Sequence, residues 1–237
     1  MRINSLVDAV ELGKDVAVLS PEESHHLARV LRVQPGREMT LFDGRGGVAE
    51  ALVQTVSKTA VEVRISKRWT VPPPAVQIDL FQAVPKPDRW ELVLQKAVEL
   101  GVSNIQPILT QHTEFKPNPK KQDRWQKIVL NAAQQCEIRW LPTLRPLEKL
   151  DAVLSALKGY DLVLVGSLYE DTHPFREVSF AGKTKVALLI GPEGDFSEEE
   201  VSAAVQAGAL PVSFGDRILR TETAAIFGLS ILAYELL

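Results

Sequence analysis

Three short segments in the C-terminal half of the chain combine glycine with residues that could surround a small molecule. Residues 165–167 read VGS, residues 189–197 read LIGPEGDFS, and residues 214–223 read FGDRILRTET. Glycines at 166, 191, 194 and 215 allow the backbone to approach a ligand closely and to adopt positive φ angles. Ordinary turns also contain glycine, so these positions alone leave both interpretations open.

Arg217, Arg220 and Glu222 stand where the last helix is expected to begin. Positive charge at a helix N-terminus opposes the helix dipole, so these arginines do not help the helix to form. A local conflict of this kind tends to mark a functional position. A surface ion pair is the alternative interpretation.

Several well-known catalytic and nucleotide-binding motifs are absent from the sequence. It contains no G-x-x-x-x-G-K-[ST] loop, no G-x-G-x-x-G after a strand, no H-E-x-x-H and no G-x-S-x-G elbow. The four histidines, at 25, 26, 112 and 173, do not form a metal-ligand pattern, so we expect no metal. The glycine-containing loops therefore suit group transfer from a bound small molecule, without a metal or a protein nucleophile.

The composition is that of a globular protein with a sizeable core. The chain has 237 residues, of which 45% are apolar and 24% charged, which suits one large domain or two smaller ones. No apolar run approaches the roughly 18 residues of a membrane span, and residues 1–15 do not read as a signal peptide. A single cysteine, Cys136, allows neither an internal disulfide nor a zinc cluster. We therefore expect a cytoplasmic protein in which Cys136 is a small apolar helix residue.

The net charge of -3 hides a basic segment. Residues 116–145 hold seven basic side chains against only two acidic ones, Asp123 and Glu137. A local excess of this size can hold phosphates although the whole chain is acidic. A solvated helix face explains the same charges, and both interpretations stay open.

The hydropathy pattern divides the chain into two parts. Residues 1–71 are rich in predicted strands, with an apolar run that ends in a glycine-rich turn at 40–47 and strict alternation at 61–65. One short helix is expected near Pro21, with Ser20 as its N-cap. Residues 71–74 (VPPP) form a stiff, extended linker, so we predict domains at 1–71 and 72–237.

After the linker, strands alternate with helices. We predict strands at 76–84, 105–109, 162–165 and 186–190, and helices at 88–100 (capped by Asp88), 123–136, 197–208 (with a capping box) and 222–237. This order indicates an α/β layer fold with a mostly parallel sheet. Ligands of such sheets bind beyond the carboxyl ends of the strands, where the three glycine-containing segments lie.

Taken together, these segments resemble the bacterial 16S rRNA (uracil-N3)-methyltransferases, a branch of the SPOUT superfamily. In the first domain the resemblance rests on the sequence HHL at 25–27, VLR at 30–32, Gly36 and DG at 43–44. In the second domain it rests on Lys96 with ELG at 99–101, NAAQQC at 131–136, GPEG at 191–194 and RILRTETA at 217–224. The last two segments, in this order near the C-terminus, are quite specific.

The resemblance implies a fold and an activity. It implies a trefoil-knotted SPOUT α/β methyltransferase domain over 72–237, preceded by a small PUA-like β-barrel over 1–71 that helps to hold RNA. The activity implied is S-adenosylmethionine-dependent methylation of uridine N3 in 16S rRNA of the small ribosomal subunit, by a homodimer. Two alternatives remain: a non-catalytic RNA-binding or ribosome-assembly factor of the same fold, and an enzyme that acts on another RNA or on ribose.

The resemblance also assigns residues. Arg220 is the candidate that stabilises the deprotonated uracil, and Glu222 is a candidate base or orienter of Arg220. The cofactor pocket is expected to be lined by Gly166, Ser167, Ile190, Gly191, Gly194, Phe214, Gly215 and Leu219. RNA contacts are expected from Arg29, Arg32, Lys116, Lys120, Arg139 and Arg217, each of which could instead be a solvated charge.

Three positions depart from the family pattern. Asp195 follows GPEG where relatives often have a second glycine, so the flexibility of this loop can differ. His112 stands where an arginine is expected, which puts a phosphate contact there in doubt. Glu137 and Ile138 replace a common glycine-arginine pair, and Arg139 is the candidate substitute.

Overall fold

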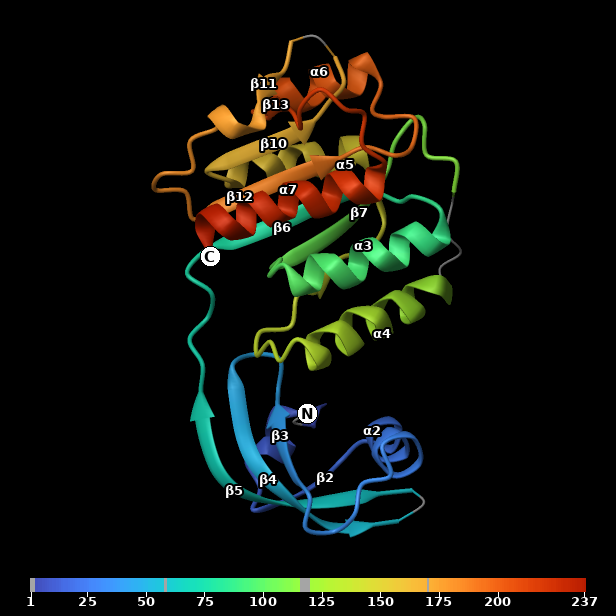
Figure 1. The fold of residues 1–237 in the computed structure, drawn as a ribbon, viewed down its shortest axis with the longest axis vertical. Coiled ribbons are helices and arrows are strands. Elements are labelled where there is room, and N and C mark those ends of the chain that lie inside the picture. Colours follow the sequence, from blue (N-terminus) through green and yellow to red (C-terminus); the bar gives the residue numbers. More distant parts are fainter. Residues whose placement is uncertain (1–2, 58, 116–119, 170) are drawn as a thin grey trace. The chain divides into compact units, whose positions relative to one another are not determined.

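The computed structural model of the protein describes residues 3–57, 59–115, 120–169 and 171–237 (Figure 1). The chain divides into two compact units. Unit 1 comprises Met1–Pro74 together with Ala133–Leu141, and unit 2 comprises Ala75–Ala132 together with Pro142–Leu237. The extended residues 71–74 thus lie at the end of the first stretch of unit 1, but the return of residues 133–141 to this unit has no counterpart in the sequence pattern.

Unit 1 is built on a five-stranded sheet in the order β1-β3-β4-β5-β2. The strands are β1 (Asn4–Leu6), β2 (Val16–Val18), β3 (Glu38–Phe42), β4 (Gly47–Val56) and β5 (Val61–Thr70). Neighbouring strands are antiparallel except β1 and β3, which are parallel. The alternation predicted from the sequence at the start of β5 is confirmed, because Val61, Val63 and Ile65 are buried.

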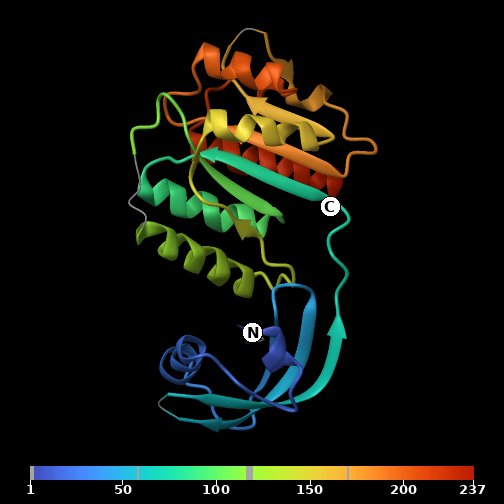
Figure 2. The ribbon, with the colours of Figure 1, turned by 180° about the vertical axis from the view of Figure 1, so that it is seen from behind.

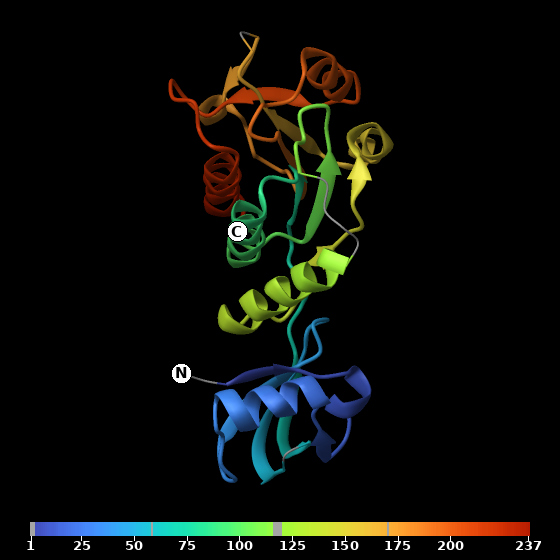
Figure 3. The same ribbon diagram turned by 90° about the vertical axis from the view of Figure 1, so that its right-hand side faces the viewer.

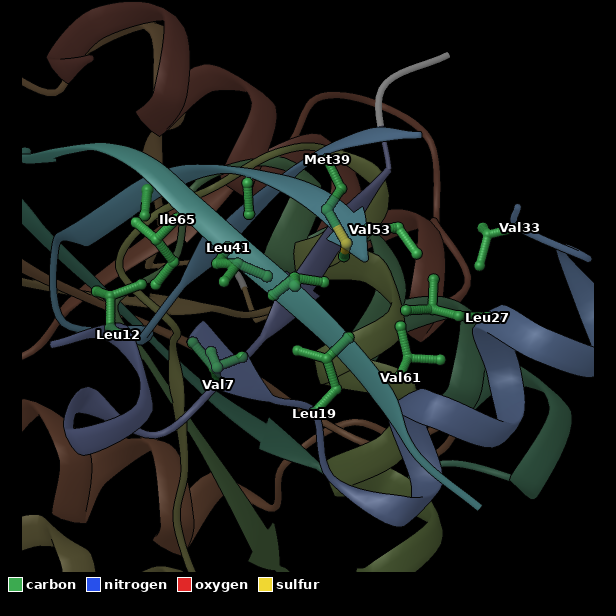
Figure 4. Packing of buried hydrophobic residues seen from close by; sticks show 14 residues of the cluster. Val7, Leu12, Leu19, Leu27, Val33, Met39, Leu41, Val53, Val61 and Ile65 are labelled. Carbon is green, nitrogen blue, oxygen red and sulfur yellow. The ribbon is translucent and has the colours of Figure 1, made fainter. Parts of the chain in front are cut away.

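The helical segments of unit 1 cover one hydrophobic core. They are α1 (Ala9–Leu12), α2 (Pro21–His25) and η1, a π-helix (His26–Val30) that continues α2. Ser20 caps α2 as predicted, since its Oγ accepts the Glu23 N–H at 3.2 Å. Figure 4 shows Leu12, Leu27 and Leu41 pointing into the same cluster as the strand residues.

Residues 133–141 belong to unit 1 through a set of specific contacts. The Trp140 indole N–H donates to the Val71 carbonyl at 3.0 Å, and the Arg139 guanidinium donates to the Asn4 side chain at 3.0 Å. Backbone bonds join the same segment to the turn between β3 and β4, from Gly46 N to Arg139 O and from Leu141 N to Gly44 O. The segment therefore completes unit 1 with side-chain as well as main-chain contacts.

Unit 2 contains a parallel sheet, as the alternating pattern predicts. Its eight strands run in the order β11-β13-β10-β12-β6-β7-β8, with β9 also paired to β7. Their bounds are β6 (Gln77–Ala83), β7 (Asn104–Leu109), β8 (Thr143–Leu144), β9 (Glu148–Lys149), β10 (Leu162–Gly166), β11 (His173–Pro174), β12 (Lys185–Ile190) and β13 (Leu210–Ser213). The continuous apolar runs of β10 and β12 lie side by side in the centre of the sheet and are buried.

Helices cover both faces of this sheet. They are α3 (Pro87–Glu99), α5 (Leu150–Leu154), α6 (Glu198–Gln206) and α7 (Thr221–Leu236), with the 3₁₀ segments η2 (Ser155–Gly159) and η3 (Phe175–Glu177). A further helix, α4 (Lys120–Gln135), begins in unit 2 and ends in unit 1. Figures 1 and 3 place α3 and α7 on one face, and Figures 2 and 3 place α5 and α6 on the other. Unit 2 is therefore a three-layer α/β unit. Over the described ranges, no helix has the length and apolarity that a membrane crossing requires.

The predicted cap of α3 is wrong, although the helix itself is confirmed. Asp88 lies inside the first turn, and Lys86 is the N-cap residue with Pro87 at the first helical position. Proline at this position presets the helical φ and needs no N–H partner. The Lys86 N–H donates instead to the carboxylate of Glu193, at 3.3 Å, a residue 107 positions away that local sequence does not reveal.

Candidate active site

A cavity of about 530 Å³ lies at the carboxyl edge of the parallel sheet. Its wall is formed by the segments that follow β10, β12 and β13, as the three glycine-containing segments predict. Predicted cofactor residues on the wall are Gly166, Ser167, Ile190, Gly191, Phe214, Gly215 and Leu219. The eighth, Gly194, is outside this lining and lies against His112.

Two of the glycines are required by close packing. A Cβ atom on Gly166 would lie 2.9 Å from the Phe214 ring, and one on Gly191 would lie 2.9 Å from an Asp195 carboxylate oxygen. Cβ atoms do not approach other heavy atoms so closely without displacing them. Glycine at 166 and 191 thus serves close approach at the cavity, and the interpretation as ordinary turns does not account for these two positions.

A buried hydrogen-bond network joins the cavity wall to the middle of the sheet. Gln82, at the end of β6, is fully buried, and its side-chain amide donates to the Thr221 hydroxyl at 2.9 Å. The Thr221 hydroxyl in turn donates to the Gly191 carbonyl at 2.6 Å. The start of α7 and the loop after β12 are therefore fixed to one central strand. Sequence reasoning missed Gln82, because a polar residue inside an apolar run carries no local sign of its partners.

Asp195 connects two of the cavity loops. Its carboxylate accepts the N–H of Phe196 at 2.8 Å and the N–H of Leu168, in the loop after β10, at 3.1 Å. Burial raises the pKa of the Asp195 carboxyl, although the two backbone donors act in the opposite direction. The backbone of Asp195 is left-handed, with φ of 59°. The departure from a second glycine therefore supplies a carboxylate that ties one loop to the other.

The predicted catalytic residues, Arg220 and Glu222, lie in two environments, and Arg217, a predicted RNA contact, shares that of Arg220. Arg217 and Arg220 are exposed on the wall of the cavity, and Arg220 is the N-cap residue of α7. The Glu222 side chain is 12% exposed, and its Oε1 lies 3.8 Å from the Nε of Arg89 in α3. Arg89 also donates to Glu193 of the GPEG loop at 3.3 Å and lines the cavity. The structure thus pairs Glu222 with Arg89, a residue that sequence reasoning missed.

Within the part of the chain that the structure describes, one carboxylate oxygen of Glu222 lacks a hydrogen-bond donor. Its Oε2 is buried and has no hydrogen-bond partner among the residues that the structure describes. A buried carboxylate oxygen without a donor is costly, so it is a place where a further donor would be favourable.

The predicted RNA contacts are spread over both units. Arg29 and Arg32 are exposed, in and just after the π-helix, and Arg32 has a left-handed φ of 51°. The Arg139 side chain is 17% exposed and stacks over the Phe42 ring at 5.6 Å, inside unit 1. Lys116 lies outside the described residues, and for Lys120 only its place at the start of α4 is described.

Comparison with known proteins identifies the family. Residues 72–233 match the family model described as an RNA methyltransferase domain, and residues 19–66 match that of an RNA methyltransferase PUA domain. The chain belongs to this RNA methyltransferase family. The family resemblance inferred from GPEG and RILRTETA is confirmed.

Relatives of this RNA methyltransferase are similar over almost its whole length. The ribosomal RNA small subunit methyltransferase E of Synechocystis sp. is 31% identical, covering 97% of the chain and 77% of the relative. The protein of the same name from Mycobacterium bovis is 31% identical, covering 94% of the chain and 88% of the relative.

Two solved structures share the fold of this RNA methyltransferase. A methyltransferase from Legionella pneumophila, in complex with S-adenosylmethionine, is 36% identical with a TM-score of 0.89, covering 98% of the chain and 96% of that protein. The ribosomal RNA small subunit methyltransferase E of Neisseria gonorrhoeae, bound to S-adenosylmethionine, is 29% identical with a TM-score of 0.88, covering 99% and 98%. The α/β methyltransferase fold with a PUA-like domain is therefore established for this chain.

Proposed function

We propose that this protein methylates N3 of a uridine in 16S rRNA of the small ribosomal subunit, with S-adenosylmethionine as methyl donor. The observation that carries the proposal is that seven of the eight predicted cofactor residues line one cavity together with Arg217 and Arg220. Relatives named ribosomal RNA small subunit methyltransferase E, and two solved relatives that hold S-adenosylmethionine, support it.

The cavity suits this cofactor in size and chemistry. Its volume of about 530 Å³ lies within the range of small-molecule sites, about 300–1,000 Å³. Backbone at Gly166 and Gly191 can approach adenine and ribose, and Ile190 and Leu219 offer apolar cover. Asp195 and Asp216 on the same wall bring negative charge toward a cationic ligand. When bound, S-adenosylmethionine supplies an electrophilic methyl group on a sulfonium.

Arg220 supplies the stabilisation that the nucleophile needs. Uridine N3 carries a proton and becomes a good nucleophile only when this proton leaves, after which negative charge spreads over O2 and O4. The exposed Arg220 guanidinium on the cavity wall can donate to these oxygens and so lower the barrier. With the cofactor bound, the N3–carbon bond would form as the methyl–sulfur bond breaks, and Arg220 would hold the charge on O2 and O4 until then.

Glu222 is our candidate for the base that removes the proton from N3. It lies next to Thr221, a cavity residue, and Arg89 holds one of its carboxylate oxygens. Its partnerless Oε2 would receive the proton, but this atom is buried and Glu222 does not line the cavity, so the role requires the side chain to turn toward the substrate. In this role Arg89, rather than Arg220, is the residue that Glu222 pairs with.

The two domains divide the work in our proposal. Residues 1–71 act as a PUA-like β-barrel that holds RNA through Arg29 and Arg32, and residues 72–237 form the SPOUT trefoil knot that shapes the pocket. The exposure of both arginines and the match of residues 72–233 to an RNA methyltransferase domain support these assignments. We further propose that the enzyme works as a homodimer in the cytoplasm. Its target uridine must be unstacked to reach the cofactor.

Nucleoside mass analysis tests the function directly. The purified protein is incubated with S-adenosylmethionine and small subunits from a strain that lacks this gene, and digested 16S rRNA is examined for methylated uridine. We expect 3-methyluridine to appear at one position. Methylation of ribose or of another base would refute the N3 assignment. A protein that fails to bind S-adenosylmethionine at equilibrium would instead favour the non-catalytic RNA-binding factor.

A further inference from the structure

His112 lies in the loop after β7 and faces the GPEG loop. Its Nδ1 is 3.1 Å from the Gly194 carbonyl oxygen and 3.0 Å from the Asp195 carbonyl oxygen. Carbonyl oxygens only accept hydrogen bonds, so Nδ1 must carry a hydrogen and donate it to both. The geometry therefore assigns the Nδ1–H form to His112, whether the ring is neutral or charged.

The two carbonyls belong to a strained stretch of backbone. Asp195 adopts a φ of 59°, which is unfavourable for a residue with a side chain. In this conformation its carbonyl turns toward His112 while its carboxylate accepts the N–H groups of Leu168 and Phe196. Asp195 must adopt this backbone conformation for its carboxylate to accept both N–H groups. The hydrogen bond from His112 to its carbonyl offsets part of the energetic cost of that conformation.

The loop that carries His112 is itself anchored. The Gln111 N–H donates to Glu200 Oε1 at 2.7 Å, and the other oxygen of Glu200 accepts the N–H of Ser197, the N-cap of α6, at 3.0 Å. Thr113 accepts the Thr110 N–H at 3.0 Å within the same loop. Hydrogen bonds on both sides of His112 thus hold its loop in place.

Gly194 packs closely against His112. A Cβ atom on Gly194 would lie 3.2 Å from the Cβ of His112. The absence of a side chain at Gly194 therefore lets the His112 side chain approach this loop closely.

We propose that His112 is a positioning residue for the cofactor cavity: its Nδ1–H holds Gly194 and Asp195 so that the Asp195 carboxylate closes the loop after β10 onto the GPEG loop. The inference rests on the proposed binding of S-adenosylmethionine in this cavity. His112 acts through the loop and needs no contact with the cofactor or the RNA. An arginine at this position would instead be suited to a phosphate contact, which the imidazole could make only through Nε2.

Two amide variants distinguish positioning of the loop through Nδ1 from a phosphate contact through Nε2. The side-chain nitrogen in His112→Asn occupies the place of Nδ1, whereas that in His112→Gln occupies the place of Nε2. We expect His112→Asn to bind S-adenosylmethionine within about 2-fold of the natural protein. His112→Gln and His112→Ala should bind about 5- to 10-fold more weakly, the usual effect of losing a hydrogen bond. His25→Ala, an exposed histidine of unit 1, is the matched control and should bind normally. Affinities are measured by titration calorimetry.

A second measurement does not depend on the cofactor. Amide hydrogen exchange at Leu168 reports the bond to Asp195, and without cofactor it should be faster in His112→Ala and His112→Gln but normal in His112→Asn. Equal exchange and equal affinity in all three variants would overturn the inference. Normal exchange at Leu168 and normal affinity in His112→Gln would also overturn it. If the natural protein failed to bind S-adenosylmethionine while exchange followed the expected order, only the proposed function would fail.

Discussion

Arg217 and Arg220 lie on the cavity wall directly ahead of a helix whose dipole opposes their charge. The conflict is limited because Arg220 has the extended backbone of an N-cap residue and Glu222 supplies an acid in the first turn. Neither arginine is buried, so neither contributes to the core. In the proposed function, their position suits a ligand that carries negative charge during the reaction.

Removal of the Arg220 guanidinium should affect turnover more than binding. We expect Arg220→Ala to lower kcat about 100- to 1,000-fold, as for the loss of one donor to a developing anion, with cofactor affinity nearly unchanged. Steady-state transfer of labelled methyl groups to small subunits measures kcat. Arg176→Ala removes an arginine whose side chain is 86% exposed and should keep full activity. Full turnover by Arg220→Ala would exclude this residue from the mechanism.

A methyl group at residue 166 should block the cavity. In Gly166→Ala the new Cβ meets the Phe214 ring at 2.9 Å, so either the ring or the loop must move. We expect at least about 10-fold weaker binding of S-adenosylmethionine, equivalent to about 1.4 kcal/mol. Gly159→Ala is the control, since its Cβ would meet only the end of Lys185 at 3.6 Å. Equal affinities in the two variants would contradict the close-packing argument.

Asp195 predicts a dependence of stability on pH. Its folded-state pKa is raised above the ordinary value of 3.8, mainly by burial, so the folded state binds this proton more tightly than the unfolded state does. The resulting stabilisation is complete below pH 3.8 and is lost as pH rises through the raised pKa. Urea unfolding should therefore show the natural protein losing stability relative to Asp195→Asn as pH rises from about 4. A difference that stays constant or changes in the opposite direction would contradict this.

At the scale of single residues, the sequence predicted the wall of the cavity but not the contacts behind it. Gly166 and Gly191 could be found because apolar runs ended at them, and RILRTETA because its charges oppose the helix. Gln82 and Arg89 could not, since their partners are 139 and 104 residues away. Hydrogen bonds between distant segments leave no periodic signal in a single sequence.

The helices and strands that support the cavity were easier to predict than their boundaries. The runs at β10 and β12 are long enough to identify buried strands, and Ser197 with Glu200 marks the start of α6. β13 was missed because it has only four residues and contains Pro211, which is unusual inside a sheet. The two-residue strands β8, β9 and β11 depend on pairing with β7 or β13 rather than on their own sequence.

The capping box of α6 gives a prediction at the level of one helix. The Ser197 hydroxyl accepts the Glu200 N–H while the Glu200 carboxylate accepts the Ser197 N–H. Ser197→Ala should therefore lower the free energy of unfolding by about 1 kcal/mol. Ser202→Ala, at an exposed position in the same helix, should change it far less. Urea denaturation measures both, and equal losses would mean that the cap contributes nothing.

At the scale of the whole molecule, unit 2 carries a charged cluster at the edge of its sheet opposite the cavity. Asp79 in β6 is fully buried and accepts hydrogen bonds from Arg145 at 3.0 Å, Tyr160 at 2.5 Å and Asn104 at 2.8 Å. Burial and the neighbouring Asp79 carboxylate raise the pKa of Tyr160. The cluster joins β6, β7 and the start of β10, so it supports the sheet and not the chemistry.

Loss of the Asp79 carboxylate should destabilise the protein without changing its site. We expect Asp79→Ala to lower the free energy of unfolding by about 3–5 kcal/mol, because Arg145 would lose a buried partner. Cofactor affinity of the folded fraction, measured at low temperature, should remain normal. Asp171→Ala, at an exposed position, should leave stability almost unchanged. A specific loss of affinity in Asp79→Ala with normal stability would show that the cluster serves the site.

The membership of residues 133–141 in unit 1 has a consequence for biosynthesis. A growing chain that has just left the ribosome up to the VPPP linker still lacks the segment that bonds to Asn4, Gly46 and Val71. At about 5–20 residues per second, the amino-terminal unit must wait on the order of ten seconds for it. The amino-terminal unit therefore emerges incomplete, and nascent-chain proteolysis should find its strands protected only after Leu141 has emerged.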